Sequence, residues 1–311
     1  MNKRVSVHIV TFNSGEDIIP CLKAVQAQTY PIEEIVIVDN HSTDDTLERI
    51  LCLQNTIGEK LKIIINQENL GFAPGHNQAI GVTDSDYILV LNPDVTLDPS
   101  YVELLINSLE THLGVGSATG KLLLKSNPEI VDSTGLIMNK AYRAFDRGAG
   151  EPSSKWNQSG EVFGVSGAAA MYSRKMIQDI SINEEFFDGD FFAYKEDVDV
   201  AWRAQVLGWK SYFHAEAIGY HARGWKKGTR QRQPLFIRRY SYINRYKMIY
   251  KNSDRFRLLL DLALVLPYEI ASNGYFLLRE VRILGAWKLF IKQYSDLKSK
   301  RKAINEKQSM R

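Results

Sequence analysis

Two acidic segments, far apart in the chain, carry the side chains best suited to catalysis. Asn92-Pro93-Asp94-Val95 and the run Phe191–Asp199 each follow an apolar stretch, so both can end at one cleft. A carboxylate such as Asp94 can hold Mg²⁺ or Mn²⁺ against the oxygens of a diphosphate. Asp197, with Glu196 beside it, can act as a general base that takes a proton from an acceptor hydroxyl. This division of roles indicates group transfer from a nucleotide-activated donor.

Each of these residues also has a purely structural interpretation. Asp94 can be a turn residue, and Glu196 and Asp197 can be acids that the dipole favours at a helix start. His221 follows an apolar run, and a single histidine is more often structural than a metal ligand. Because His221 follows Asp94, an acidic candidate for metal binding, it is a second candidate metal ligand. Aromatic residues near the second segment, such as Trp202, form either core or a partly dry wall for a sugar.

Alternating apolar runs and helical spacings predict the scaffold that positions these groups. The apolar runs are Val5–Val10, Ile35–Val38, Ile63–Ile65 and Tyr87–Leu91. The segments with helical spacing between them are Asp17–Gln28, Asp44–Leu53 and Gly75–Val82. This alternation is typical of βαβ units in an α/β fold with a mainly parallel sheet. In such a sheet the carboxyl ends of the strands meet at one edge, where ligands bind.

Short polar side chains follow three of these runs, so we expect them at that edge. They are Thr11, Asn13, Asp39, Asn40 and Asn92. Taken singly, each is more often a cap or a turn residue, but clusters at successive strand ends favour contacts to a base and a ribose. The segment that begins at Gly71 and leads to Asn77 opens a helix, and backbone amides at a helix start suit phosphate.

The second half of the predicted catalytic region has three further features. Residues 139–160 are rich in Gly, Ser and Pro and show no period, so we expect a long loop over the cleft. A helix is expected over Glu196–Leu207, ending at Gly208. Two strands are expected after it, Lys210–His214 and Ala217–Tyr220.

Charge divides the chain into two parts. The chain has 311 residues, of which 44% are hydrophobic and 24% charged, as expected for a globular protein with one large domain and an appendage. Residues 1–222 carry a net charge of −13 and residues 223–311 one of +16. We therefore expect an acidic catalytic domain over 1–225 and a basic helical extension over 226–311. Few cysteines and the lack of a signal peptide favour a cytoplasmic location.

The expected extension mixes basic and apolar residues. Leu258–Leu266 is apolar, stops at Pro267 and is too short to span a membrane, whereas Gly274–Ile291 is amphipathic. Such helices lie in a membrane interface, pack on the first domain or join two subunits. We expect contact with a membrane surface through residues 226–292, or a homodimer. Because the cations interleave with long apolar runs, the pattern argues against a nucleic-acid partner.

Six segments, taken together, resemble the inverting family 2 glycosyltransferases with the GT-A fold over about residues 3–225. In chain order they are VTFNS, VDNHSTDDT, NLGFAPGHN, LNPDV, VSGAAAMYSRK and FFAYKEDVDVAWR. The third and sixth look most like the bacterial rhamnosyltransferase branch, which builds cell-envelope polysaccharides and lipid-linked glycans. The resemblance implies transfer of L-rhamnose from dTDP-L-rhamnose to a hydroxyl of such an acceptor. The alternatives are a UDP- or GDP-sugar donor, or a non-catalytic protein that binds sugar nucleotides.

The resemblance also implies a role for individual residues. Donor contacts are implied for Thr11, Asn13, Asp39, Asn40, Gly71, Asn77, Asn92 and Asp94. Contacts on the sugar and acceptor side are implied for Ser166, Gly167, Ala168 and Trp202. Asp94 matches the last acid of the DXD metal motif, whose first acid is Asn92 here, and His221 matches a histidine that completes a Mg²⁺ or Mn²⁺ site. Asp197 matches the catalytic base with Glu196 beside it, and Arg203 matches a recurring arginine of open role.

Two absences narrow the function. A nucleotidyltransferase would need a basic glycine-rich loop near the N-terminus, and residues 11–17 contain no Lys or Arg. The chain also lacks the QxxRW pattern of polymerising relatives. Within the resemblance, this second absence implies that one or a few sugars are added.

Overall fold

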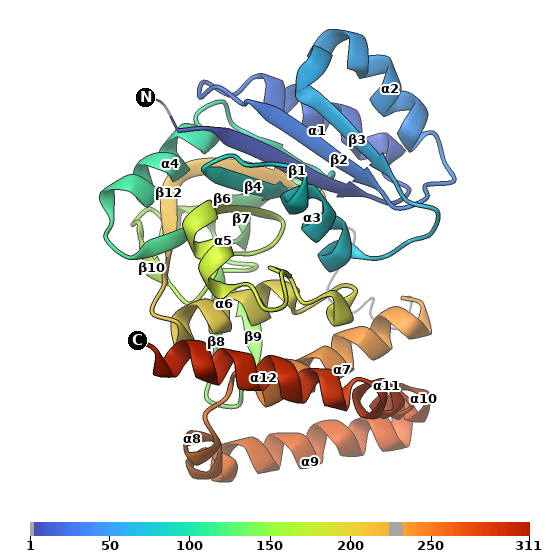
Figure 1. The fold of residues 1–311 in the computed structure, drawn as a ribbon, viewed down its shortest axis with the longest axis vertical. Coiled ribbons are helices and arrows are strands. Elements are labelled where there is room, and N and C mark those ends of the chain that lie inside the picture. Colours follow the sequence, from blue (N-terminus) through green and yellow to red (C-terminus); the bar gives the residue numbers. More distant parts are fainter. Residues whose placement is uncertain (1–2, 224–232) are drawn as a thin grey trace.

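The computed structural model describes residues 3–223 and 233–311 (Figure 1). In this part of the chain a large mixed sheet carries helices on both faces, and a layer of helices follows at the C-terminal end. The α/β class and the helical C-terminal extension predicted from the sequence are confirmed. The predicted domain boundary at 225/226 lies outside the described residues.

The sheet combines a parallel half with a half in which parallel and antiparallel pairs are mixed. Its strands are β1 (Val5–Thr11), β2 (Glu34–Asp39), β3 (Leu61–Ile65), β4 (Tyr87–Leu91), β5 (Val95–Leu97), β6 (Val115–Leu124), β7 (Asn127–Ser133), β10 (Gly160–Val162), β11 (Ala169–Ser173) and β12 (Lys210–His221). The main order is β10-β12-β6-β11-β4-β1-β2-β3, and β4, β1, β2 and β3 run parallel. Thr11 pairs with Asp39, and Ile9 pairs with Leu91. The three strands therefore end at one edge, as predicted.

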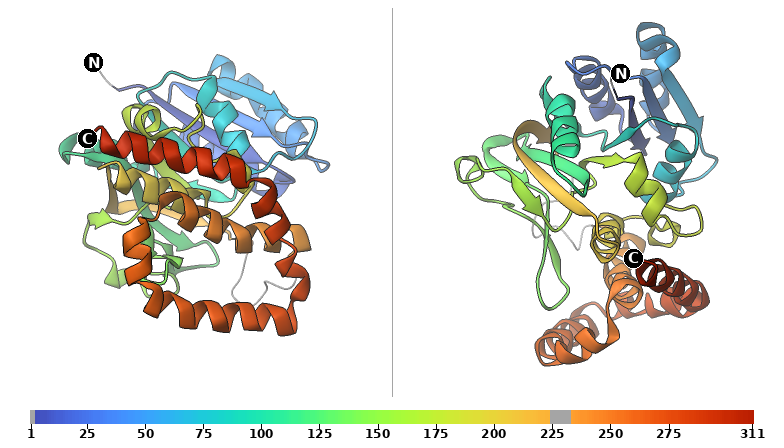
Figure 2. Two further views of the ribbon diagram at one scale, coloured as in Figure 1. Left: turned by 60° about the horizontal axis from the view of Figure 1, so that its bottom comes forward. Right: turned by 60° about the vertical axis from the view of Figure 1, so that its left-hand side comes forward.

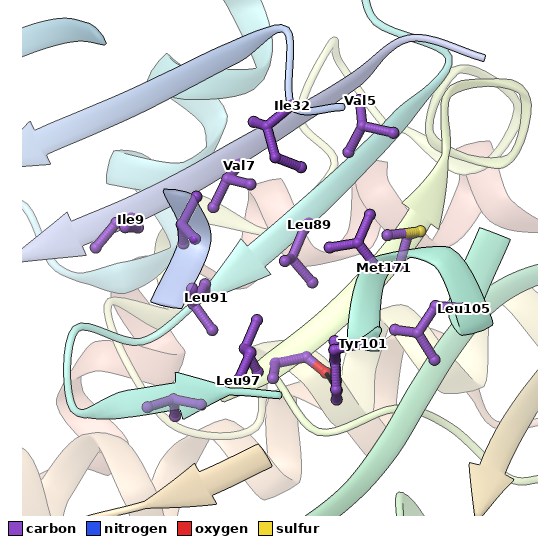
Figure 3. Packing of buried hydrophobic residues seen from close by; sticks show 14 of the residues in the cluster. Val5, Val7, Ile9, Ile32, Leu89, Leu91, Leu97, Tyr101, Leu105 and Met171 are labelled. Carbon is purple, nitrogen blue, oxygen red and sulfur yellow. Dashed lines mark hydrogen bonds between the residues drawn. The ribbon is translucent and has the colours of Figure 1, made fainter. Parts of the chain in front are cut away.

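Apolar side chains on both faces of the central strands explain why these strands are continuous hydrophobic runs. On one face, Val5, Val7 and Ile9 pack with residues of the helices on that side (Figure 3). On the other face, Val36 and Val38 pack in a separate cluster. Each such side chain, when fully buried, contributes about 1.5–3 kcal/mol of hydrophobic stabilisation, so the strands form a firm base for the site.

The helices around the sheet include the four that the sequence analysis predicted, with small shifts at their ends, and two that it did not predict, the fourth and the fifth. They are α1 (Gly15–Gln26), α2 (Thr46–Ile57), α3 (Phe72–Gly81), α4 (Tyr101–Thr111), α5 (Arg174–Ile180) and α6 (Glu196–Val206), and single 3₁₀ turns lie at Gly58–Lys60, Ser153–Lys155 and Gly189–Phe191. Residues of α1 and α4 pack against one face of the sheet, and residues of α5 and α6 pack on the other side. The first turn of α6 carries Glu196 and Asp197, as predicted.

Two predictions between residues 139 and 221 are wrong. Residues 139–160 are not an unstructured loop, because β9 (Ala144–Asp146) pairs with β8 (Leu136–Met138) in a separate hairpin. Strands of three residues are too short to show a sequence period. The two strands expected at Lys210–His214 and Ala217–Tyr220 form the single strand β12. Its register against β6 shifts between His214 and Ile218, but the strand continues through this irregularity, and buried and more exposed residues alternate along its whole length.

The C-terminal extension is a layer of helices below the sheet (Figures 1 and 2). They are α7 (Leu235–Asn252), α8 (Arg255–Leu260), α9 (Leu262–Arg279), α10 (Val281–Leu284), α11 (Trp287–Lys292) and α12 (Tyr294–Ser309). Helices α7 and α12 lie side by side next to α6, whereas α9 lies on the outer side of the layer. None of the described helices has both the length and the apolar character that a membrane span requires.

Two boundaries expected in the extension are wrong. Pro267 does not end the apolar segment, because α9 continues through it to Arg279. A proline removes only its own N–H, and the rest of the helical ladder remains available. The amphipathic stretch Gly274–Ile291 is not one helix, since the chain breaks at Glu280 and again near Gly285. These breaks turn the chain back towards α7 and α12.

Candidate functional site

Asp39 is the centre of a hydrogen-bonded cluster at the predicted edge of the sheet. Thr11 Oγ1 donates to Asp39 Oδ1 at 2.9 Å, and the backbone N–H and hydroxyl of Ser42 bind the same carboxylate at 2.9 and 2.5 Å. Asn13 joins this cluster, since its N–H donates to Ser42 Oγ at 2.9 Å and its Oδ1 accepts from the N–H of Thr43 at 2.8 Å. The structure therefore brings together Thr11, Asn13 and Asp39, which the sequence had placed at three different points in the chain.

Asn40 connects this edge to the loop before α3. Its Nδ2 donates to the carbonyl of Gly71 at 3.0 Å, and its Oδ1 accepts from Asn66 at 2.9 Å. Gly71 has φ of +91°, and a Cβ at this position would lie 2.4 Å from the carbonyl oxygen of Phe192. Only glycine fits here. This close approach sets the loop before α3 against the turn that leads into α6.

Asn77 and Arg203, both singled out in the sequence, form hydrogen bonds with the protein's own backbone. Both ends of the Asn77 amide bind Phe187, with Nδ2 donating to its carbonyl at 2.7 Å and Oδ1 accepting from its N–H at 3.0 Å. Asn77 thus anchors α3 to the segment before α6, and its predicted contact with a donor stays a prediction. Arg203 is buried and donates to the carbonyls of Ile180 and Phe186, both at 2.6 Å. These buried hydrogen bonds give Arg203 a structural role, which the sequence analysis had left open.

Asp94 and His221 come together because β5 pairs with the end of β12, where Val95 is opposite His221. His221 Nε2 lies 3.2 Å from Asp94 Oδ2, and Nδ1 donates to Asp132 Oδ2 at 2.7 Å. Burial lowers the pKa of His221, but its bonds to Asp132 and Asp94 outweigh burial and raise the pKa to about 9. Asp132, only 2% exposed, is a residue that the sequence analysis missed.

In its neutral form His221 would hold a divalent cation together with Asp94, and binding of the cation would release the ring proton. Carboxylate oxygen and imidazole nitrogen are ordinary ligands of such ions, and a carboxylate on the far ring nitrogen commonly orients a metal-binding histidine. Among the described residues, no group of three or more His, Cys, Asp or Glu side chains is arranged to hold a metal. A cation with few protein ligands is typical of sites where substrate phosphates and water complete the coordination.

The backbone of Ser166–Ala168 joins the predicted base to the Asp94 turn. The N–H of Gly167 donates to Asp197 Oδ2 at 3.2 Å. One residue later, the carbonyl of Ala168 accepts from the N–H of Asn92 at 2.9 Å. The two acidic segments, far apart in sequence, are therefore held by one short stretch of backbone, and the predicted convergence is present.

The neighbouring carboxyl groups of Glu196 and Asp197 have different surroundings. Glu196 is 7% exposed, and burial, followed by the charge of Asp197, raises its pKa to about 8. Burial also raises the pKa of Asp197, but Lys195 and the N–H of Gly167 oppose this shift. The pair titrates as a unit, in which Glu196 keeps its proton at neutral pH. Asp197 is then the carboxylate able to accept a proton.

The turn before α6 is strained and is held by α7. Phe192, Tyr194 and Lys195 have positive φ of +58°, +71° and +76°. Each such residue costs on the order of 1 kcal/mol or more and persists only where its surroundings impose it. Asn244 of α7 is fully buried, and its Nδ2 donates to three carbonyls of this turn at 2.8–3.1 Å. The sequence analysis missed Asn244, whose only signal was an amide in a basic, aromatic helix.

Trp202 lies apart from the Asp39 cluster. Its ring stacks on Tyr142, next to the β8–β9 hairpin, with centroids 5.2 Å apart and planes at 8°. The structure thus groups Trp202 with the hairpin, and its predicted contact with a sugar or acceptor stays a prediction.

An open α/β sheet that gathers these acidic groups at one edge is the arrangement expected of a GT-A glycosyltransferase. Residues 6–181, more than half of the chain, match the glycosyl transferase family 2, and the protein belongs to this family. Membership confirms the enzyme class and the fold predicted from the sequence.

Curated relatives resemble this chain over about two thirds of its length at low identity. The chain is 21% identical over 214 residues to the poly-β-1,6-N-acetyl-D-glucosamine synthase of Staphylococcus epidermidis strain RP62A. It is 24% identical over 210 residues to the synthase of the same name from Staphylococcus aureus strain COL. The alignments cover 69% and 68% of this chain and 48% of each relative. The chain therefore spans about half the length of these relatives.

Solved structures show the same fold. The mannosyltransferase PcManGT from Pyrobaculum calidifontis, in complex with GDP-Man and Mn²⁺, has a TM-score of 0.59 at 16% identity and covers 95% of this chain and 76% of its own. TarS 1-349 of S. aureus, in complex with UDP, has a TM-score of 0.58 at 16% identity and covers 99% and 92%. At these identities the likeness shows the fold alone.

Proposed function

We propose that this glycosyltransferase inverts the anomeric centre of a nucleotide-sugar donor and passes the sugar to a hydroxyl of a cell-envelope or lipid-linked saccharide. The observation that carries the proposal is the backbone of Gly167 and Ala168, which holds Asp197 on one side and the Asp94 turn on the other. A proton acceptor and a candidate diphosphate site are thereby held by two consecutive residues of one backbone segment.

Asp197 takes the proton of the acceptor hydroxyl, whose oxygen bonds to the anomeric carbon. The bond from that carbon to the diphosphate oxygen breaks, and the nucleoside diphosphate leaves with the bonding electrons. Because Glu196 stays protonated, it adds no second negative charge beside the base. A divalent cation held by Asp94 and His221 would supply positive charge to the leaving diphosphate. The cluster of Thr11 and Asp39 orients the nucleotide.

We propose dTDP-L-rhamnose as the donor. Support comes from the segments around Gly71 and Asp197, which resemble the rhamnosyltransferase branch. A UDP- or GDP-sugar is the second candidate. It is favoured by the solved neighbours in complex with UDP or GDP-Man and by the N-acetylglucosamine polymer in the relatives' name.

We propose that the enzyme works at the cytoplasmic face of a membrane. Helices α8 and α9 and the segment after them expose apolar side chains, namely Phe256, Leu259, Leu260, Leu264, Ile270, Leu277, Leu278 and Val281. Exposed cations follow directly, at Arg279 and Arg282. An apolar face flanked by cations suits an anionic bilayer surface. A homodimer that covers the same face is the alternative.

A donor screen tests this function. The purified protein is titrated with dTDP-rhamnose, UDP-glucose, UDP-galactose, UDP-N-acetylglucosamine and GDP-mannose, each with Mg²⁺, Mn²⁺ or EDTA, and donor hydrolysis is followed. Asp94→Asn should weaken metal-dependent donor binding, whereas Asp197→Asn should keep binding and lose about 10²–10⁴-fold in turnover. Equal loss of donor affinity in both variants would contradict the assigned roles. Failure of all five donors to bind would overturn the proposed donor class.

A further inference from the structure

A cavity of about 260 Å³ lies between the β8–β9 hairpin, the turn before α6, α7 and α9. We call it the hairpin pocket. Its walls include Tyr142, Arg143, Lys195, Arg245, Tyr268 and Ser272. The right-hand view of Figure 2 shows the hairpin extending towards the C-terminal helices that close this space. No predicted site residue lines it, but Lys195 immediately precedes Glu196.

Three cationic side chains line the hairpin pocket, and they differ in the ion pairs that they form. Arg245 is occupied, because it pairs with Glu269 at 2.5 Å and donates to the carbonyls of Ala141 and Tyr142 at 2.6 and 3.2 Å. Arg143 and Lys195 make no ion pair with any carboxylate in residues 3–223 and 233–311. Within the part of the chain that the structure describes, these two cations are therefore not engaged in an ion pair, and they can bind an anionic ligand.

Arg143 is held in a way that leaves its hydrogen-bond donors available. Its guanidinium carbon lies 4.6 Å from the ring centroid of Tyr268 and 4.8 Å from that of Phe145. Stacking engages the flat face of a guanidinium, while its N–H groups lie at the edge and match the oxygens of phosphate. A preorganised, unpaired guanidinium in a cavity indicates an anionic ligand.

The hairpin pocket lies between the predicted base and the exposed apolar face. On one side, the charge of Lys195 lowers the pKa of Asp197, and Asp146, the last residue of β9, raises it, so both groups act on the base. On the other side, α9 provides Tyr268 and Ser272 to the pocket while it exposes Ile270 and Leu277. One molecule with a hydroxyl, a phosphate and a lipid chain could meet all three regions in order.

We propose that the hairpin pocket binds a phosphate group of the acceptor, with the lipid chain that carries this phosphate lying on the apolar face of α9. This inference rests on the proposed glycosyltransferase function, and it specifies the class of acceptor. Arg143 and Lys195 bind the phosphate oxygens, and the sugar attached to the phosphate extends towards Asp197.

Isothermal titration in EDTA tests the proposal with farnesyl diphosphate, inorganic pyrophosphate and farnesol as probes. Ser272→Asp adds a negative charge inside the pocket and should weaken binding of farnesyl diphosphate about tenfold or more. Asn305→Asp adds the same charge at an exposed position of α12, which neither lines the pocket nor belongs to the apolar face, and should leave affinity within about twofold. Arg143→Gln should weaken binding as Ser272→Asp does. Thermal melts of the variants establish that they are folded.

The outcomes separate the possible ligands. Farnesyl diphosphate that binds Ser272→Asp as tightly as Asn305→Asp would overturn the proposal, as would farnesol that binds as tightly as farnesyl diphosphate. Pyrophosphate that binds as well as farnesyl diphosphate would keep the phosphate site and remove the lipid. Donor hydrolysis is measured on the same proteins. If the wild type binds farnesyl diphosphate but neither binds nor hydrolyses any donor, the proposed function fails and the pocket stands.

Discussion

Replacing Lys300 by methionine should destabilise the protein far more than an ordinary lysine substitution. Lys300 of α12 is 8% exposed, and its Nζ lies 2.7 Å from Asp188, 3.0 Å from Asp190 and 2.6 Å from Asp296. Asp188 is itself buried and also pairs with Lys251 of α7. Burial raises the pKa of Asp188, but the two ammonium groups outweigh it and hold this pKa well below its ordinary value. These charges join the extension to the catalytic region.

The expected loss of unfolding free energy depends on which buried charges remain unpaired in the variant. In Lys300→Met, the Asp188 and Asp190 carboxylates lose their shared cation, while Lys251 still bonds Asp188. Removing one partner of a buried ion pair costs about 3–5 kcal/mol, and we expect the lower end, about 3 kcal/mol, because one cation stays. Methionine keeps most of the apolar stem, so little packing is lost.

Urea unfolding at pH 7, followed by circular dichroism, measures the effect against a matched control. Lys302→Met lies two residues further along the same helix, where Lys302 pairs with Glu306 at 3.6 Å and both side chains are more than half exposed. This control should lose less than about 1 kcal/mol. Folding lowers the pKa of Asp188, so the stabilisation it provides is present above its unfolded pKa and is lost as pH falls. The gap between wild type and Lys300→Met should therefore narrow below about pH 4. Equal unfolding midpoints for the two variants at pH 7 would refute this reasoning.

Three further predictions concern the site and the apolar face. Folding raises the pKa of Glu196 from 4.5 to about 8, so the wild type should lose stability as pH rises through that window, and Glu196→Gln should flatten this loss in urea unfolding between pH 5 and 9. Asn244→Ala removes the hydrogen bonds that hold the strained turn before α6, so kcat should fall while donor Kd stays unchanged. The control Asn305→Ala, at an exposed position of α12, should change neither value. A normal kcat in Asn244→Ala would contradict the role of Asn244 in positioning this turn. Leu278 is 82% exposed on α9, and Leu278→Asp should reduce flotation of the protein with anionic vesicles. The control Leu113→Asp, at a 97% exposed position after α4, should leave flotation unchanged. Equal flotation of both variants would argue against membrane docking through α9, and loss of a dimer by Leu278→Asp in light scattering would identify a subunit interface instead.

Much of the scaffold could be predicted because its signals are local. The strands that end at Thr11, Asp39 and Leu91 are β-branched runs buried on both faces, and parallel neighbours must end at one edge. The acids at the start of α6 are likewise visible as a helix start after an aromatic segment. The order of the motifs along the chain was sufficient to indicate the family, which the match over residues 6–181 confirms.

The sequence by itself determined the four parallel strands, the edge where polar groups gather and the two acidic segments, because short-range periodicity and strand direction dictate these features. Only the tertiary structure decided which distant residues complete the site. Asp132 of β7 reaches His221 of β12 because both strands pair with β6, and Asn244 reaches the turn before α6 from a helix in another part of the chain. Contacts over such separations depend on how whole elements pack, and no local pattern encodes the packing of α7 against α6. For the same reason, the hairpin pocket becomes visible only when the hairpin, α7 and α9 are assembled.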